Sequence, residues 1–306
     1  MKHFLIYALS HICADLLKRL RWKNGIKCPY CGSSNVVKNG RYGKFKEFHK
    51  YKCKACSKNF NDKTATLFAN SKIPIYLWFG FFFLFFIIHI SFRKGRLILK
   101  ISIFTLRKMF FRTVERWREL AHQKFYGEVE MDEKYIKAGY KGQRGKPKLF
   151  GRKPRKRGPK GKPGRGTWSD DKIPVVSIVM RGKEKKKRLI CVRDVSCWTL
   201  RGVAMENICY GSKVYTDERR GYNLIPYERE VVEHGSREYA KGKAHVNNCE
   251  NLHSLLYLFV EVHRGVNKEY LQKYLDGFII SHQVWNLGFL EGMEKLLKIA
   301  IYKISS

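Results

Sequence analysis

The chain has 306 residues, of which 44% are hydrophobic, so it is long enough for two or more domains and is not a disordered chain. Lys and Arg total 62 against 26 Asp and Glu, which gives a formal net charge of +36. Self-repulsion on this scale destabilises a compact fold, so we expect an anionic partner, either nucleic acid or an acidic membrane surface.

The first 22 residues predict an amphipathic helix. One early Lys precedes a short apolar run, a pattern that a secretory signal peptide shares. The segment then continues into "DLLKRL", where charged and apolar residues recur at helical spacing. We therefore expect a helix over 1–22 and keep a signal peptide as the alternative.

Residues 23–64 predict a zinc ribbon. Two Cys-x-x-Cys turns, each able to face two thiolates toward one ion, are separated by about twenty residues, the spacing of a tetrahedral four-sulfur Zn²⁺ site. Asn39-Gly40 predicts a hairpin turn between them. The segment is too short and polar to bury a core of its own, so the ion has to supply the folding energy. The predicted ligands are Cys28, Cys31, Cys53 and Cys56.

The other cysteines are scattered, which is typical of a reducing compartment with no disulfide framework. His49 is an alternative ligand, although four sulfurs already complete the site. Basic residues along the ribbon favour a DNA-facing surface. The alternative is a ribbon with a purely structural role, whose basic residues only face solvent. These residues are Lys38, Arg41, Lys44, Lys46, Lys50, Lys52, Lys54 and Lys58.

The segment 73–90 contains no charged residue and approaches the length of a membrane span. Pro74 at its start, His89 inside it and aromatic residues in its middle favour a buried helix over a span.

Helical spacing continues over 101–124, where Ser102 or Thr105 is a candidate N-cap. Residues 65–124 therefore predict a helix-turn-helix-like DNA-binding module, with an ordinary packed helical linker as the alternative. The basic residues that favour DNA binding are Arg107, Lys108, Arg112, Arg116 and Arg118.

Beyond residue 125, strands and helices follow one another, which predicts a mixed α/β domain. A loop over 137–172, rich in Gly, Pro, Lys and Arg, cannot bury apolar surface and favours binding to a phosphate backbone. Strands are expected at 127–138, 173–180, 186–195, 212–217 and 229–235, and helices at 198–208, 250–262, 268–283 and 289–303.

Three acids are placed where they could meet. Asp132 lies in a predicted strand whose alternate residues Val129 and Met131 point the other way, Asp217 ends another strand, and Glu250 opens a helix. Three carboxylates at one point repel each other unless divalent cations hold them, and such oxygen ligands suit Mg²⁺ or Mn²⁺. Two ions of this kind serve phosphodiester cleavage and strand transfer. Each acid alone also has a structural explanation, as a turn cap or a helix N-terminal acid.

The chain resembles insertion-sequence transposases that carry an N-terminal zinc ribbon and a DDE catalytic domain, the ISXO2-like group related to Merlin elements. The matching stretches are "CPYCGS", "YKCKACSKNF", "TATLFANSKIP", "VEMDEKYI", "GSKVYTDERRGY" and "AHVNNCENLHSLL". The resemblance covers about residues 20–285 and implies a ribonuclease-H-like domain over 125–285, followed by a C-terminal helix over 286–306. It also implies two-metal chemistry with Mg²⁺ or Mn²⁺ and binding to the DNA of element ends and of the target.

Matched by position, the resemblance implies that Asp132, Asp217 and Glu250 are the catalytic metal ligands, with Asp132 preferred to Glu133. His245, Asn247 and Asn251 match the segment around the last acid and would orient DNA or a ligand, with helix capping as the alternative for the two asparagines. The family's basic residue after the final acid is replaced here by Tyr257. His253 or Arg264 is a candidate to make that phosphate contact instead.

We therefore expect a DNA transposase that acts as a homo-oligomer on DNA, in the cytoplasm at the nucleoid or, in a eukaryote, in the nucleus. Two alternatives remain at this stage. One is a catalytically inactive zinc-ribbon DNA-binding protein, favoured by Tyr257. The other is a membrane-associated zinc protein, favoured by the 73–90 segment.

Overall fold

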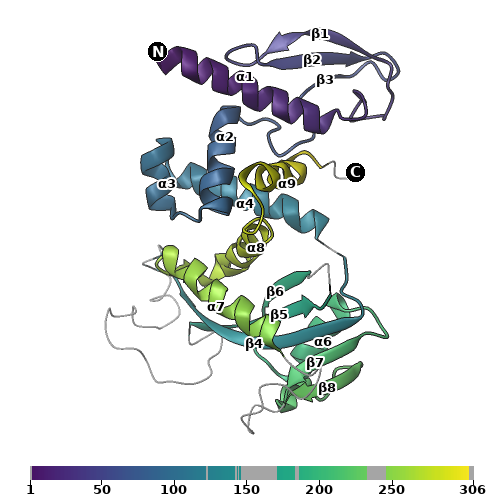
Figure 1. Ribbon diagram of the computed structural model, residues 1–306, viewed down its shortest axis with the longest axis vertical. Coiled ribbons are helices and arrows are strands. Elements are labelled where there is room, and N and C mark those ends of the chain that lie inside the picture. Colours follow the sequence, from purple (N-terminus) through teal and green to yellow (C-terminus); the bar gives the residue numbers. More distant parts are fainter. Residues whose placement is uncertain are drawn as a thin grey trace. The chain divides into compact units, whose positions relative to one another are not determined.

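The computed structural model describes residues 2–121, 123–141, 143, 145, 171–182, 186–232 and 246–302 (Figure 1). The chain divides into two compact units, one made of Met1–Ala121 with Ile280–Ser306 and the other of His122–Ile279. The C-terminal residues thus share a unit with the N-terminal segments, whereas the sequence placed the last boundary at 285 and gave the final helix a segment of its own.

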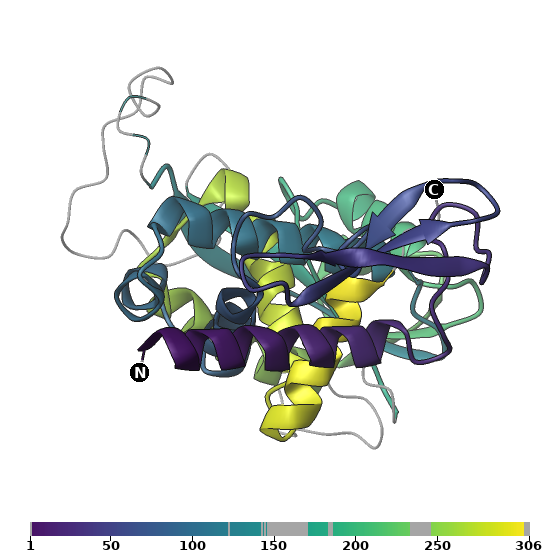
Figure 2. The same cartoon turned by 90° about the horizontal axis from the view of Figure 1, so that it is seen from above.

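In the first unit, a long helix lies along a small antiparallel sheet (Figure 2). The helix is α1 (Lys2–Arg21), and the sheet has the order β1-β2-β3. Its strands are β1 (Val36–Tyr42), β2 (Phe48–Cys53) and β3 (Asn59–Asn61). The helix and the ribbon hairpin expected from the sequence are both present.

The predicted hairpin turn at Asn39-Gly40 is wrong. Both residues lie inside β1, where the register shifts between Lys38 and Arg41 and Gly40 adopts a φ of 81°. The chain turns instead after Gly43, which has a φ of 103°. A glycine is required there, because a Cβ would lie 2.2 Å from the Glu47 carboxylate. That buried carboxylate accepts a 3.0 Å hydrogen bond from the Phe45 amide and fixes the turn.

The apolar segment 73–90 packs into the core of the first unit. Helix α2 (Ile75–Phe82) continues into a π-helical turn (Phe83–Ile87), and Phe86 stacks on Phe110 with ring centroids 5.5 Å apart. Trp78, Phe81 and Phe86 are buried. Within the part of the chain that is described, no helix combines the length and the apolar character that crossing a bilayer requires.

Three further helices surround this core. They are α3 (Phe92–Leu99), α4 (Ile103–Leu120) and α9 (Phe289–Ile301). Ser102 caps α4, as expected, by accepting a hydrogen bond from the Thr105 amide. Two of the basic residues assigned to DNA are used internally, because Arg112 donates to the Leu67 carbonyl and Arg116 to the Ala65 carbonyl.

The second unit is a mixed α/β domain, as predicted. Its described strands form a sheet of order β6-β5-β4-β7-β8, and β9 pairs with β4. The neighbours β4, β5 and β6 are antiparallel, whereas β7 runs parallel to β4 and β8 parallel to β7. The strands are β4 (Glu128–Gly139), β5 (Lys172–Met180), β6 (Lys187–Cys191), β7 (Lys213–Asp217), β8 (Glu228–Val232) and β9 (Val266–Asn267). Of the predicted basic loop 137–172, residues 142, 144 and 146–170 lie outside the described residues.

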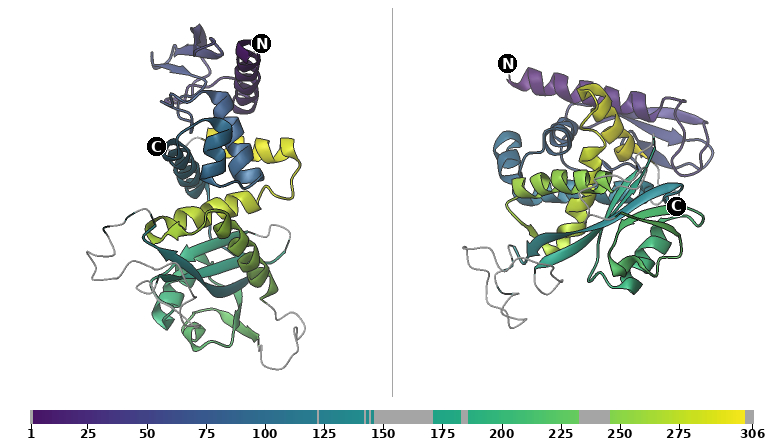
Figure 3. Two further views of the ribbon diagram at one scale, coloured as in Figure 1. Left: turned by 90° about the vertical axis from the view of Figure 1, so that its left-hand side faces the viewer. Right: turned by 60° about the horizontal axis from the view of Figure 1, so that its bottom comes forward.

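Helices cover both faces of this sheet (Figure 3). Helix α6 (Cys197–Asn207) packs Leu200 and Ala204 against Val129 and Met131, which point away from Asp132 as the strand alternation predicted. Helix α7 (Asn247–Val262) lies on the opposite face, against β4 and β5. Helix α8 (Leu271–His282) follows a short 3₁₀ turn at Lys268–Tyr270.

Candidate metal centres

The structure brings the four predicted cysteines together. Their sulfur atoms all lie within 4.8 Å of one another. Cys28 Sγ is 3.6 Å from Cys56 Sγ, and Cys31 Sγ is 3.6 Å from Cys53 Sγ. A tetrahedral Zn²⁺ ion with Zn–S bonds of about 2.3 Å would hold its sulfurs about 3.8 Å apart. The four cysteines are free thiols, so donor type and spacing both fit zinc.

Each Cys-x-x-Cys pair sits in a tight turn. The Cys28 amide donates to the Ser33 carbonyl at 2.9 Å, and the Cys53 amide donates to the Lys58 carbonyl at 3.0 Å. The Cys56 amide donates to the Cys53 sulfur and lowers the pKa of that thiol to about 7. This backbone hydrogen bond favours the thiolate form of Cys53, in which sulfur binds a metal ion, whereas the pKa of Cys31 in the same cluster is raised.

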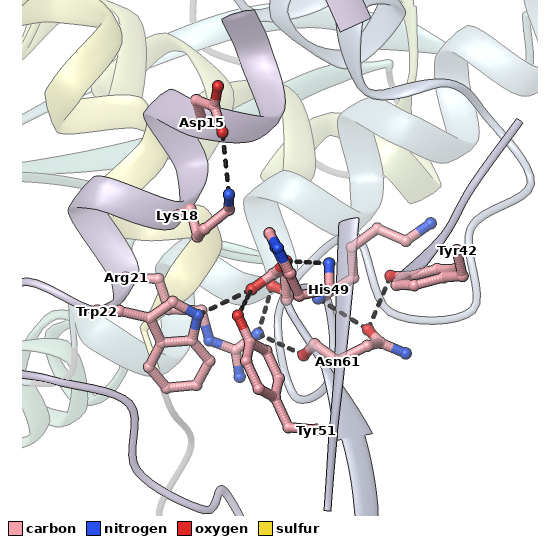
Figure 4. A network of polar contacts seen from close by, with 10 residues as sticks. Asp15, Lys18, Arg21, Trp22, Tyr42, His49, Tyr51 and Asn61 are labelled. Carbon is pink, nitrogen blue, oxygen red and sulfur yellow. Dashed lines mark hydrogen bonds and ion pairs between the residues drawn. The ribbon is translucent and has the colours of Figure 1, made fainter. Parts of the chain in front are cut away.

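A buried carboxylate, that of Asp62, joins the end of α1 to the ribbon. Figure 4 shows its partners Trp22, His49 and Tyr51 converging on one polar network. Asp62 is 0% exposed and accepts hydrogen bonds from Trp22 Nε1 at 2.9 Å, Tyr51 OH at 2.9 Å and the His49 amide at 2.6 Å. Arg21 donates to the Asp62 carbonyl and lies 4.3 Å over the Trp22 ring. The alternative ligand His49 thus belongs to this network and is not part of the cysteine cluster.

Replacing Asp62 by Ala is expected to destabilise the first unit by roughly 3 kcal/mol, because one buried and two partly buried donors lose their acceptor. Chemical denaturation of the zinc-loaded protein, followed by Trp fluorescence, measures the change. The control is Asp15→Ala, which removes a carboxylate that is 54% exposed and pairs with Lys18. That change should cost less than about 0.5 kcal/mol. Equal losses in the two variants would show that Asp62 does not anchor the ribbon.

Two aspartates that are distant in the sequence meet on adjacent strands of the second unit. Asp132 lies in β4, Asp217 is the last residue of β7, and these two strands pair in parallel (Figure 1). Carboxylate oxygens of Asp132, Asp217 and Glu133 lie within 4.8 Å of one another, and all three side chains are partly exposed. Such a group of oxygens repels itself and is suited to binding a hard divalent cation.

Glu133 is already paired with a positively charged side chain. Arg219 Nη1 forms an ion pair with Glu133 Oε1, and Tyr222 OH donates to Glu133 Oε2 at 2.8 Å. Burial, and then the charges of Asp132 and Asp217, raise the pKa of Tyr222, so this hydroxyl stays a donor. Because Arg219 neutralises Glu133, the aspartates are the better candidates for a metal ion, in agreement with the preference for Asp132 over its neighbour.

His253 connects α7 to Asp132. Its Nδ1 atom lies 3.5 Å from Asp132 Oδ2, and its Nε2 atom lies 2.9 Å from Ser177 Oγ. Ser177 is the register partner of Asp132 and donates to its carbonyl at 2.9 Å. His253 is 4% exposed, and burial lowers its pKa to about 4, so the ring is neutral at physiological pH. Of the two candidates for the family's phosphate contact, the buried His253 already contacts Ser177 and Asp132, whereas Arg264 is exposed, so burial favours Arg264.

Glu250 is exposed in the first turn of α7, and it does not belong to the close group of Asp132, Glu133 and Asp217. Residues three apart on a helix are neighbours, so Glu250 lies one turn from His253, which contacts Asp132. The structure therefore brings together the two predicted aspartates and leaves the third acid, Glu250, outside their group, one turn along α7 from His253.

The remaining predicted residues lie around the start of α7. Asn247 and Asn251 are exposed on α7, whereas His245 lies outside the described residues. The N-cap of α7 is Val246, so the asparagines do not occupy the capping position that was their alternative role. Arg264 is exposed just beyond the C-terminal end of the helix.

The fold and these two sites define a zinc-ribbon protein with an α/β domain that carries paired aspartates. Comparison with known families agrees with this class. A family model described as an ISXO2-like transposase domain matches residues 124–279, and one described as a transposase zinc-ribbon domain matches residues 11–59.

The chain belongs to the ISXO2-like transposase family. It is also similar to a protein of the transposable element ISH50 from Halobacterium salinarum. The two are 33% identical over 296 residues, which cover 94% of this chain and 96% of the relative. The resemblance seen in the sequence is confirmed, and family membership suggests a role in DNA transposition.

Proposed function

We propose that this protein is a DNA transposase that cleaves phosphodiester bonds at the ends of its element and transfers the freed strand to target DNA. The observation that carries the proposal is the meeting of Asp132 and Asp217 on two parallel strands, within 4.8 Å and partly exposed. We further propose that the second unit has a ribonuclease-H-like fold. Three antiparallel strands extended by two parallel ones support this assignment.

The donor atoms fit divalent ions of the Mg²⁺ or Mn²⁺ type, which Asp132 and Asp217 would hold, with Glu250 as the third ligand from α7. When bound, two such ions activate an attacking oxygen and stabilise a leaving oxygen. Asp217 is oriented by the Arg219 amide, which donates to its Oδ1 atom at 3.2 Å. Water would first attack the phosphodiester at the element end, breaking the P–O bond to leave a 3′-hydroxyl and a 5′-phosphate. That 3′-hydroxyl would then attack a phosphodiester of the target DNA, forming the new P–O bond and releasing a 3′-hydroxyl of the target strand.

The ribbon is proposed to bind element-end DNA through its basic residues, with Zn²⁺ held by the four cysteines. All eight ribbon lysines and arginines named above are exposed, so their charges can reach a phosphate backbone. A homo-oligomer would then hold two ends together. Metal-dependent nicking of a labelled element-end duplex by the purified protein tests the proposal, and DNA binding without nicking would contradict it.

DNA affinity is expected to fall steeply with salt, by about 0.9 log units per neutralised phosphate for each tenfold rise in salt. Replacing Lys50 and Lys52 by Ala should reduce that slope by about 1 for each lysine that neutralises a phosphate. Lys298→Ala is the control, since Lys298 already pairs with Glu294 at 2.8 Å. Titrations by fluorescence anisotropy at several salt concentrations give the slopes. Binding through the ribbon would be contradicted if DNA affinity did not change with salt. It would also be contradicted if Lys298→Ala reduced the salt slope as much as the ribbon variant does.

A further inference from the structure

The first turn of α7 is held by a carboxylate from another element, that of Glu130 in β4. Glu130 is 0% exposed. Its Oε2 atom accepts hydrogen bonds from the backbone amides of Asn248 at 3.1 Å and Cys249 at 3.3 Å. Its Oε1 atom accepts from Asn248 Nδ2 at 2.7 Å and from Arg181 Nε at 2.9 Å. Both carboxylate oxygens therefore serve to hold the start of this helix.

Helix α7 does not provide this cap itself. Its N-cap residue, Val246, makes no side-chain hydrogen bond to the first turn. The first amides of a helix have no acceptor within the helix, and its N-terminus is the positive end of the helix dipole. Both features favour a negatively charged acceptor at this point. Glu130 supplies it, and Arg181 is fixed in turn because its guanidinium lies 3.6 Å over the ring of Tyr215.

The same strand face also carries the proposed metal ligand. Glu130 and Asp132 are alternate residues of β4, so their side chains point to the same side of the sheet, toward α7. Glu130 holds the first turn of α7, and Asp132 lies beside His253 one turn later. Glu250 comes directly after Cys249, and its amide donates to the Val246 carbonyl at 3.1 Å. The placement of Glu250 along β4 thus depends on the contacts of Glu130.

We propose that Glu130 is a positioning residue of the acidic metal centre, which sets the register of α7 on β4 and so brings Glu250 to the ions held by Asp132 and Asp217. This inference rests on the function proposed above. Glu130 touches neither DNA nor metal in this role, and it acts through the helix that carries the third acid.

The test is Mn²⁺ binding to the full-length, zinc-loaded protein, followed by the electron paramagnetic resonance signal of free Mn²⁺. Glu130→Gln keeps the size of the side chain and removes its charge. We expect the half-saturating Mn²⁺ concentration to rise about tenfold or more, as for other residues that orient metal ligands. The Mn²⁺ dependence of cleavage should shift in the same direction, while metal-free DNA binding stays unchanged.

Lys141→Ala is the matched control at the other end of α7. Lys141 Nζ donates to the carbonyls of His263 at 2.5 Å, Arg264 at 3.1 Å and Gly265 at 2.7 Å, so its replacement also weakens the helix. It should lower the melting temperature without changing the half-saturating Mn²⁺ concentration, because the first turn keeps its cap. If Glu130→Gln fails to fold, Asn248→Ala removes one hydrogen bond to Glu130 and should raise that concentration about threefold.

Unchanged Mn²⁺ binding in a folded Glu130 or Asn248 variant, or an equal shift in Lys141→Ala, would overturn the inference. Asp132→Asn separates this failure from that of the proposed function. If Asp132→Asn binds Mn²⁺ as the unaltered protein does, the acidic centre itself has been assigned wrongly. If only Asp132→Asn weakens binding, the centre stands and the role of Glu130 is rejected.

Discussion

Replacing either Asp132 or Asp217 by asparagine is expected to lower the rate of DNA cleavage by about 10³-fold or more. Asparagine keeps the shape of the side chain but removes the charge and one anionic oxygen that a divalent cation requires. Single-turnover nicking of a labelled element-end duplex in Mg²⁺ measures the loss. DNA affinity should be retained, because removing an acid near the substrate only lessens repulsion of the phosphate backbone.

Glu218→Gln is the matched control for this prediction. Glu218 is the exposed neighbour of Asp217 and lies outside the close acidic group. Its replacement should leave the cleavage rate within about twofold, because exposed charges contribute little. Full cleavage by Asp132→Asn, or an equal loss in Glu218→Gln, would show that the acids have been assigned incorrectly.

Removing zinc is expected to unfold residues 23–64. The buried cluster of the ribbon, within the described residues, consists of Cys28, Tyr51, Cys53 and Phe60, and two of these are themselves proposed metal ligands. So small a core cannot offset the conformational entropy of the segment, whereas structural Zn²⁺ contributes about 10–16 kcal/mol in comparable sites. Hydrogen exchange measured by mass spectrometry, with and without a strong chelator, should show loss of amide protection across the ribbon.

Two cysteine variants make this prediction specific. Cys53→Ser should reproduce the effect of the chelator, because three thiolates no longer complete the tetrahedral site. Cys209→Ser should not, since Cys209 lies in the other compact unit and outside the sulfur cluster. Protection in His122–Ile279 should survive chelation. A ribbon that keeps its protection after complete metal removal would contradict a structural role for zinc.

Most helices and strands could be predicted from the sequence because their side chains repeat at the period of the element. The alternation around Asp132 predicted a strand with two different faces, and the structure places Val129 and Met131 in the core on the face away from α7. Ser102 was a sound N-cap candidate because a hydroxyl before a periodic apolar run satisfies the first helical amides.

Features that depend on which side chains the fold buries or pairs could not be predicted in this way. Asn39-Gly40 has the composition of a turn, but the buried carboxylate of Glu47 fixes the turn several residues later. Arg112 has the charge of a DNA-binding residue, but its guanidinium is used by a tertiary partner, the Leu67 carbonyl. Glu130 was missed although it shares a strand face with Asp132, because only the fold brings the start of α7 to it.

The central claim is that Asp132 and Asp217 jointly hold divalent ions at the bond to be cleaved. Anomalous diffraction from Mn²⁺ in crystals of the protein bound to element-end DNA tests it most directly. We predict a Mn²⁺ peak within coordination distance of both carboxylates and of a DNA phosphate. If crystals that contain DNA are saturated with Mn²⁺ and show no anomalous peak beside the two aspartates, the account is contradicted.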